Sequence, residues 1–117
     1  YIAALADVLT RHLSAEAGAS MLVPCGLGDS DEFTALFELA EFSSVQVEAV
    51  VIVRDPIDAL EAIEGNLAAL PMAEQVHAMQ DADRVAMLDD IVARLDGYIA
   101  DGILRAPMTS HIAIATV

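Results

Sequence analysis

The chain has 117 residues, which is enough for one domain with a modest hydrophobic core and too few for two. It carries 19 acidic residues against five arginines and no lysine, for a formal net charge of −14. An acidic surface of this kind repels phosphate groups, which argues against nucleic-acid binding and against binding to anionic membranes. Its longest strongly apolar stretch, 49–53, is far shorter than the roughly 18 residues of a membrane span. The lone Cys25 fits a reducing compartment, so we expect a single cytoplasmic domain over 1–117.

The first half of the chain predicts two helices and one strand. Apolar residues recur at helical spacing over the first thirteen residues, and Gly18 marks the expected end of this helical segment. The stretch 24–28 is rich in glycine and proline and predicts a loop. Asp29 then begins a capping-box pattern and a second helix, which we expect to end near Phe42. The Val-rich stretch 45–53 predicts a strand whose second half is buried on both faces.

The second half predicts three helices and a closing strand. Asp55 is followed by a proline, a common helix start, so we expect a helix over 56–70. A short helix over 72–79 and a longer one over 83–100 follow from the spacing of their apolar residues. The last strand is expected over 108–117. The sequence therefore predicts an α+β fold that is mostly helical and has two β-strands.

Residues that carry chemistry are few and scattered. Cys25 has no activating base near it in the sequence, and we expect it to be buried or half-buried. His12, His77 and His111 lie far apart, without the spacing of metal ligands. There is no glycine-rich phosphate loop and no nucleophile elbow. We therefore expect no catalytic residue, no metal site and no cofactor-binding residue within this chain.

Three stretches carry a family resemblance through their order and spacing. They are ALADVLTRHLSAEAGA (4–19), PCGLGDSDEFTALFELAEFSSVQVE (24–48) and DGILRAPMTSHIAIATV (101–117). They resemble the C-terminal part of class I S-adenosylmethionine (SAM) dependent methyltransferases, in a subgroup related to the quinone-biosynthesis methylases. The matching parts are the helix after the fifth strand, the loop, helix and sixth strand, and the closing seventh strand.

The resemblance implies the C-terminal portion of a Rossmann-like α/β methyltransferase fold. In that fold the last strand lies antiparallel beside the sixth, in an otherwise parallel sheet. The glycine-rich SAM-binding motifs of such an enzyme are not among these 117 residues. We therefore expect the chain to be the acceptor-side part of a longer SAM-dependent enzyme, with no bound cofactor and no activity by itself.

The resemblance also implies where a methyl acceptor would bind. Ligands of open α/β sheets bind beyond the carboxyl ends of the parallel strands. The insertion 55–106 would then form a helical cap, together with residues 1–28, over a small apolar or aromatic acceptor. The residues expected on this substrate side are Arg54, Arg105, Met108 and His111. Because the final strand would keep one edge free, we also expect a homodimer formed through this strand or through the cap helices.

One position departs from the family pattern. Glu41 stands where the family has a glycine before the sixth strand, and we expect a different helix exit there. Two other interpretations of the whole chain stay open. In the first, the chain is a standalone small α+β module for ligand binding or dimerisation. In the second, it is a purely structural helical interaction domain.

Overall fold

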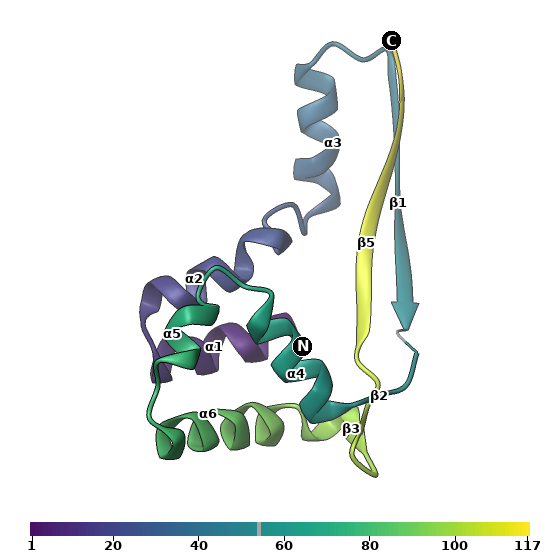
Figure 1. Ribbon diagram of the computed structural model, residues 1–117. Helices are drawn as coiled ribbons and strands as arrows, with labels where there is room; N and C mark the ends of the chain where they lie inside the picture. The colour runs from purple at the N-terminus through teal and green to yellow at the C-terminus, as the bar shows by residue number, and fades with distance from the viewer. Residues whose placement is uncertain (54) are drawn as a thin grey trace. The chain divides into compact units, whose positions relative to one another are not determined.

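The computed structural model describes residues 1–53 and 55–117. The fold is α+β and mostly helical, as predicted (Figure 1). Its antiparallel strands form two small sheets, of which the sequence predicted only the two-stranded one. The described residues form two compact units. We call residues 1–23 and 55–106 the helical unit, and Pro24–Val53 with Pro107–Val117 the ribbon unit. None of the helices in the described part of the chain is long and apolar enough to cross a membrane.

The helical unit contains five α-helices and a three-stranded sheet. Its helices are α1 (Ile2–His12), α2 (Ala15–Leu22), α4 (Ala59–Ala68), α5 (Ala73–His77) and α6 (Asp81–Arg94). Its short strands β2 (Ile57–Asp58), β3 (Ile99–Ala100) and β4 (Ile103–Leu104) pair antiparallel in the order β2-β4-β3. A 3₁₀ turn (Asp96–Tyr98) joins α6 to β3.

The hydrophobic core that the structure describes belongs to the helical unit. The predicted amphipathic helix over the first thirteen residues is confirmed, because α1 buries Leu5 and Leu9 completely. Helix α6 buries Met87 and Ile91 within its length, and Leu95 just after it. These three residues are four apart and therefore lie on one helix face.

Gly18 does not end a helix, contrary to the prediction. It lies inside α2, whose N-terminus is capped by the Ser14 hydroxyl accepting a hydrogen bond from the Ala17 N–H at 3.1 Å. A Cβ atom at Gly18 would lie 2.6 Å from the Ala6 carbonyl oxygen and closer still to the Thr10 hydroxyl. The glycine is therefore needed for the close approach of α2 to α1, and a stop signal and a packing site look alike in the sequence.

Two predicted helix limits in the second half were wrong. The first helix starts later than expected, because Asp58 rather than Asp55 caps α4, accepting from the Glu61 N–H at 3.0 Å. The helix predicted over 83–100 ends at Arg94. Ile99 and Ala100, which were predicted to end this helix, instead form strand β3 of the β3–β4 hairpin. Asp101 (φ 52°) and Gly102 (φ 77°) form the two-residue loop of this hairpin. Positive φ at both positions is the geometry that Asp-Gly favours in tight hairpins.

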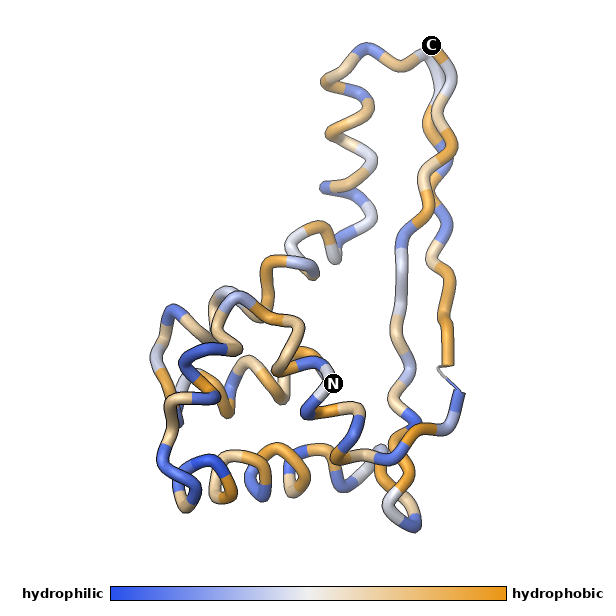
Figure 2. Tube along the Cα trace, viewed as in Figure 1, coloured by the Kyte–Doolittle hydropathy of each residue, from blue (hydrophilic) through white to orange (hydrophobic). Residues whose placement is uncertain are grey.

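The ribbon unit is built on two strands of ten residues each. Strands β1 (Ser44–Val53) and β5 (Pro107–Thr116) pair antiparallel from Ser44↔Thr116 to Val53↔Pro107. The expected strands over 45–53 and 108–117 are thus confirmed. The expected burial of β1 was wrong, since Val51, Ile52 and Val53 are between 49% and 63% exposed. Figure 2 shows this apolar run at the end of β1 in orange.

Helix α3 (Ser30–Leu39) covers one face of the β1–β5 ribbon. Asp29 caps it as predicted, accepting from the Asp31 and Glu32 N–H groups at 2.8 and 3.1 Å. Phe33 and Phe37 make an edge-to-face contact with a centroid distance of 5.3 Å. On the covered face, Val47 and its partner Ala113 are half-buried. On the other face, Ile112 and Ile114 are 52% and 65% exposed.

The exit from α3 did not change in the way we expected. Glu41 adopts φ 62°, the left-handed conformation that glycine favours. The non-glycine residue thus takes the same kind of turn and accepts the strain, because the chain must reverse between α3 and β1.

Candidate functional site

The candidate site is a hollow of about 390 Å³ in the ribbon unit, which we call the His111 pocket. One wall is the loop that precedes α3, the second is the first turn of α3, and the third is β5. The lining residues are Pro24, Cys25, Leu27, Gly28, Phe33, Thr109, Ser110 and His111. The pocket therefore combines apolar side chains with a thiol, hydroxyls and one imidazole.

His111 is the only imidazole of the pocket and is oriented by the loop. Its Nδ1 atom lies 3.4 Å from the Leu27 carbonyl oxygen. Because a carbonyl oxygen only accepts, this contact requires the proton on Nδ1. The neutral ring then presents Nε2 as a hydrogen-bond acceptor, and Nε2 makes no hydrogen bond to the described residues.

Asp29 is the charged neighbour of His111. The backbone N–H of Glu32, and after it that of Asp31, lowers the pKa of the Asp29 carboxyl, and a positive charge on the neighbouring His111 imidazole would lower it slightly further. The carboxylate is thus engaged at the start of α3 and also contributes negative potential near the imidazole. This arrangement disfavours an anionic ligand beside His111.

The residues that the sequence assigned to the substrate side lie in different places. Arg54 lies outside the described residues. Arg105 is an exposed residue of the helical unit, and its backbone N–H donates to the Tyr98 carbonyl oxygen at 2.9 Å. Met108 is 39% exposed and lies on the opposite face of β5 from His111, because side chains alternate along a strand. Of the three that the structure describes, His111 is therefore the one that lines the pocket.

Sequence reasoning missed Cys25 and Phe33 as pocket residues. Cys25 is exposed, where we had expected it to be at least half-buried, and it shares the pocket with His111. The sequence carried a weak signal for this pocket. The loop before Asp29 and the start of the strand predicted from residue 108 were both expected on the substrate side. Pairing across 84 residues is not visible in local spacing.

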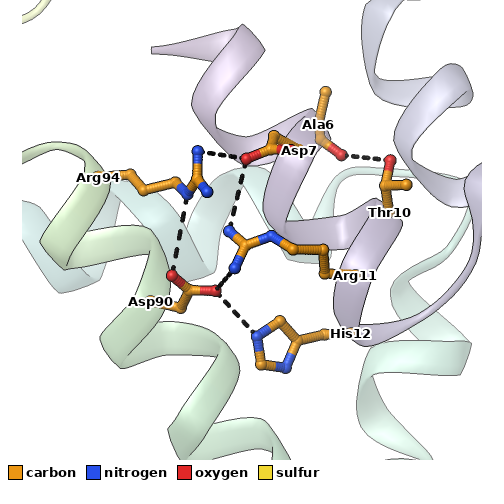
Figure 3. Close-up of polar contacts among 7 residues, drawn as sticks. All are labelled: Ala6, Asp7, Thr10, Arg11, His12, Asp90 and Arg94. Carbon is orange, nitrogen blue, oxygen red and sulfur yellow. Dashed lines mark hydrogen bonds and ion pairs between the residues drawn. The ribbon is translucent and has the colours of Figure 1, made fainter.

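A second polar cluster lies in the helical unit, between α1 and α6 (Figure 3). Asp90 Oδ2 lies 2.7 Å from the Arg11 guanidinium and 3.1 Å from Nε2 of His12. Asp7 pairs with the guanidinium groups of both Arg11 and Arg94. Each carboxylate is matched by cations from the two helices, so the cluster stabilises the packing of α1 against α6.

No metal site accompanies either cluster. Within residues 1–53 and 55–117 there is no group of three or more His, Cys, Asp or Glu side chains that could hold a metal ion. Comparisons of this chain with protein-family models, with curated protein sequences and with solved structures found no match.

Proposed function

We propose that this chain is the C-terminal, acceptor-side portion of a SAM-dependent methyltransferase of the Rossmann-like class, inactive without the part that binds SAM. The observation that carries the proposal is the β1–β5 ladder. Strands β1 and β5, whose pairing of Val53 with Pro107 closes over the 53 intervening residues, run antiparallel over ten residue pairs. This is the arrangement that the sequence resemblance implies for the sixth and seventh strands.

The uncovered parts of the ribbon support the same proposal. A two-stranded ribbon is marginally stable by itself in water. Here α3 covers one face, while Ile52, Ile112 and Ile114 are about half exposed or more on the other. A larger parallel sheet with helices on both faces would bury these side chains and pair the free edge of β5.

The acceptor side follows from the same topology. The insertion between β1 and β5, 55–106, would act with the N-terminal helices as a cap that selects a small apolar or aromatic acceptor and excludes water. Methyl transfer from a sulfonium needs mainly alignment and desolvation, which an apolar cap supplies. SAM is then held by the glycine-rich part of the enzyme, and we place the enzyme in the cytoplasm.

The test compares SAM binding by the 117-residue chain and by the native polypeptide that contains it. Isothermal titration calorimetry should show SAM binding by the native polypeptide and none by the 117-residue chain. Comparing the two proteins shows whether the 117-residue chain itself contains the SAM-binding site. Failure of the native polypeptide to bind SAM would refute the proposal.

A standalone ligand-binding or dimerisation module is the second candidate function. The His111 pocket favours it, because all eight lining residues belong to the ribbon unit. Ligand binding at this pocket therefore needs no other part of a methyltransferase. The free edges of β1 and β5 would serve a homodimer in either case.

A further inference from the structure

We propose that the His111 pocket binds a small neutral aromatic molecule that carries a hydroxyl group, and that Nε2 of His111 accepts the hydrogen of this hydroxyl. The proposal rests on the proposed function in one respect only: the bound hydroxyl oxygen is then the atom that receives the methyl group. Binding itself requires nothing outside the ribbon unit.

The hydrogen-bond pattern of His111 selects a donor. The Leu27 carbonyl oxygen, 3.4 Å away, takes the Nδ1 proton, and this leaves a lone pair on Nε2. A ligand that satisfies a neutral imidazole at Nε2 must donate a hydrogen bond. A hydroxyl group does so, whereas an ether of the same shape cannot.

The apolar walls of the pocket favour a ligand with an aromatic ring. Pro24, Leu27 and Phe33 supply apolar surface on two sides of the pocket. Phe33 is half-buried and touches Phe37 edge to face, a contact that favours one orientation of its ring. A volume of about 390 Å³ is at the small end of ligand pockets and suits one or two rings.

The charges select a neutral ligand. Among the described residues no arginine lines the pocket, and the nearby Asp29 carboxylate adds negative potential beside it. The chain as a whole carries a formal charge of −14. A carboxylate or phosphate would be repelled by this negative charge, while a neutral phenolic hydroxyl would not.

In the methyl-transfer step the hydroxyl oxygen attacks the methyl carbon of a sulfonium donor. The carbon–sulfur bond breaks and its electron pair returns to sulfur, which leaves a neutral thioether. The hydroxyl proton passes to Nε2 of His111, and the resulting imidazolium is stabilised by the Asp29 carboxylate and the Leu27 carbonyl oxygen.

The test measures binding of 4-methylphenol and of its methyl ether, 4-methylanisole, by NMR chemical-shift titration without any methyl donor. We expect the phenol to bind roughly three- to tenfold more tightly than the ether, as one neutral hydrogen bond provides. His111→Phe keeps a ring but no acceptor and should abolish this preference. Ile112→Gln, at the next position on the opposite face, should leave it intact.

The outcomes separate this proposal from the proposed function. Equal affinities of phenol and ether, a preference that survives in His111→Phe, or no binding of either compound would overturn the pocket proposal. Binding of the phenol without methylation by the native polypeptide and SAM would instead count against the methyltransferase. Methylation of an acceptor at an unchanged rate in His111→Phe would support the methyltransferase but show that His111 takes no part in the reaction.

Discussion

Nε2 of His12 lies 3.1 Å from Oδ2 of Asp90, a carboxylate 78 residues further along the chain. The same oxygen contacts the Arg11 guanidinium at 2.7 Å, so Asp90 connects α6 to the end of α1. We expect Asp90→Asn to lower the melting temperature, because the amide keeps the shape but loses the charge that the arginine meets. The matched control is Asp89→Asn, at an exposed neighbouring site, which should change stability by no more than about 0.5 kcal/mol. Equal melting temperatures for the two variants by circular dichroism would show that the cluster does not hold α1.

The contribution of Asp90 should depend on pH in a defined direction. The hydrogen bond with His12 lowers the pKa of Asp90 most, partial burial opposes it, and Arg11 and Arg94 lower the pKa further. A carboxyl whose folded-state pKa is lowered adds stability above its usual value of about 4, and this stability is lost as the pH falls through the folded-state pKa. The difference in unfolding free energy between the wild type and Asp90→Asn should therefore be constant near neutral pH and shrink below about pH 4. Urea unfolding at several pH values measures it, and a difference that grows on acidification would contradict the account.

Gly18→Ala should destabilise the helical unit by about 1–3 kcal/mol, the usual cost of overpacking. The added Cβ would meet the Ala6 carbonyl oxygen at 2.6 Å, and backbone atoms cannot turn aside as a flexible side chain can. Gly65→Ala is the matched control, since this glycine lies within α4 and a Cβ added there would have no atom from outside its own helix backbone within 4 Å. The control should be neutral or stabilise by up to about 1 kcal/mol through helix propensity. Urea unfolding of both variants decides the point, and a neutral Gly18→Ala would mean that α1 and α2 do not pack so closely.

Glu41→Gly should stabilise the ribbon unit by up to about 1 kcal/mol. Glu41 has φ 62°, a conformation that costs a non-glycine residue about 1–2 kcal/mol. Glycine removes this cost, but its larger conformational entropy in the unfolded state cancels part of the gain. Glu38→Gly, inside α3, is the control and should destabilise by about 1 kcal/mol. Thermal unfolding that shows the same sign for both variants would exclude a strained left-handed residue at 41.

The contrast between these positions shows what the sequence could and could not predict. Local patterns were sufficient for α1, the Asp29 cap and the two long strands, because periodicity and capping are properties of neighbouring residues. The hairpin after α6 carried a recognisable Asp101-Gly102 signal that the helical spacing of 83–100 outweighed.

The remaining features depend on contacts between distant parts of the chain. Gly18 serves helix packing rather than helix termination, and only the position of Ala6 reveals this. The contact of His111 with the Leu27 carbonyl oxygen likewise joins residues 84 apart. Of the candidate site, the sequence could therefore name His111 and the loop before Asp29 but not the pocket that they form together.

We expect a homodimer through the uncovered side of the ribbon unit. Ile114 is 65% exposed on a strand with a free edge, and a charge there should oppose association of two such ribbons. Ile114→Lys should therefore shift the protein towards the monomer in sedimentation equilibrium at high micromolar concentration. Leu60→Lys, at a 50% exposed position on α4, is the control for a general charge effect. A monomeric wild type at this concentration would be evidence against the dimer.

The central claim, that this chain is the acceptor-side part of a longer methyltransferase, is tested most directly by the intact mass of the native polypeptide that contains it. Mass spectrometry of the polypeptide isolated from its own cells should give a value well above the 12.3 kDa of these 117 residues. The additional mass should include a glycine-rich SAM-binding segment. A native mass near 12.3 kDa would contradict the account and leave a small α+β module with one pocket.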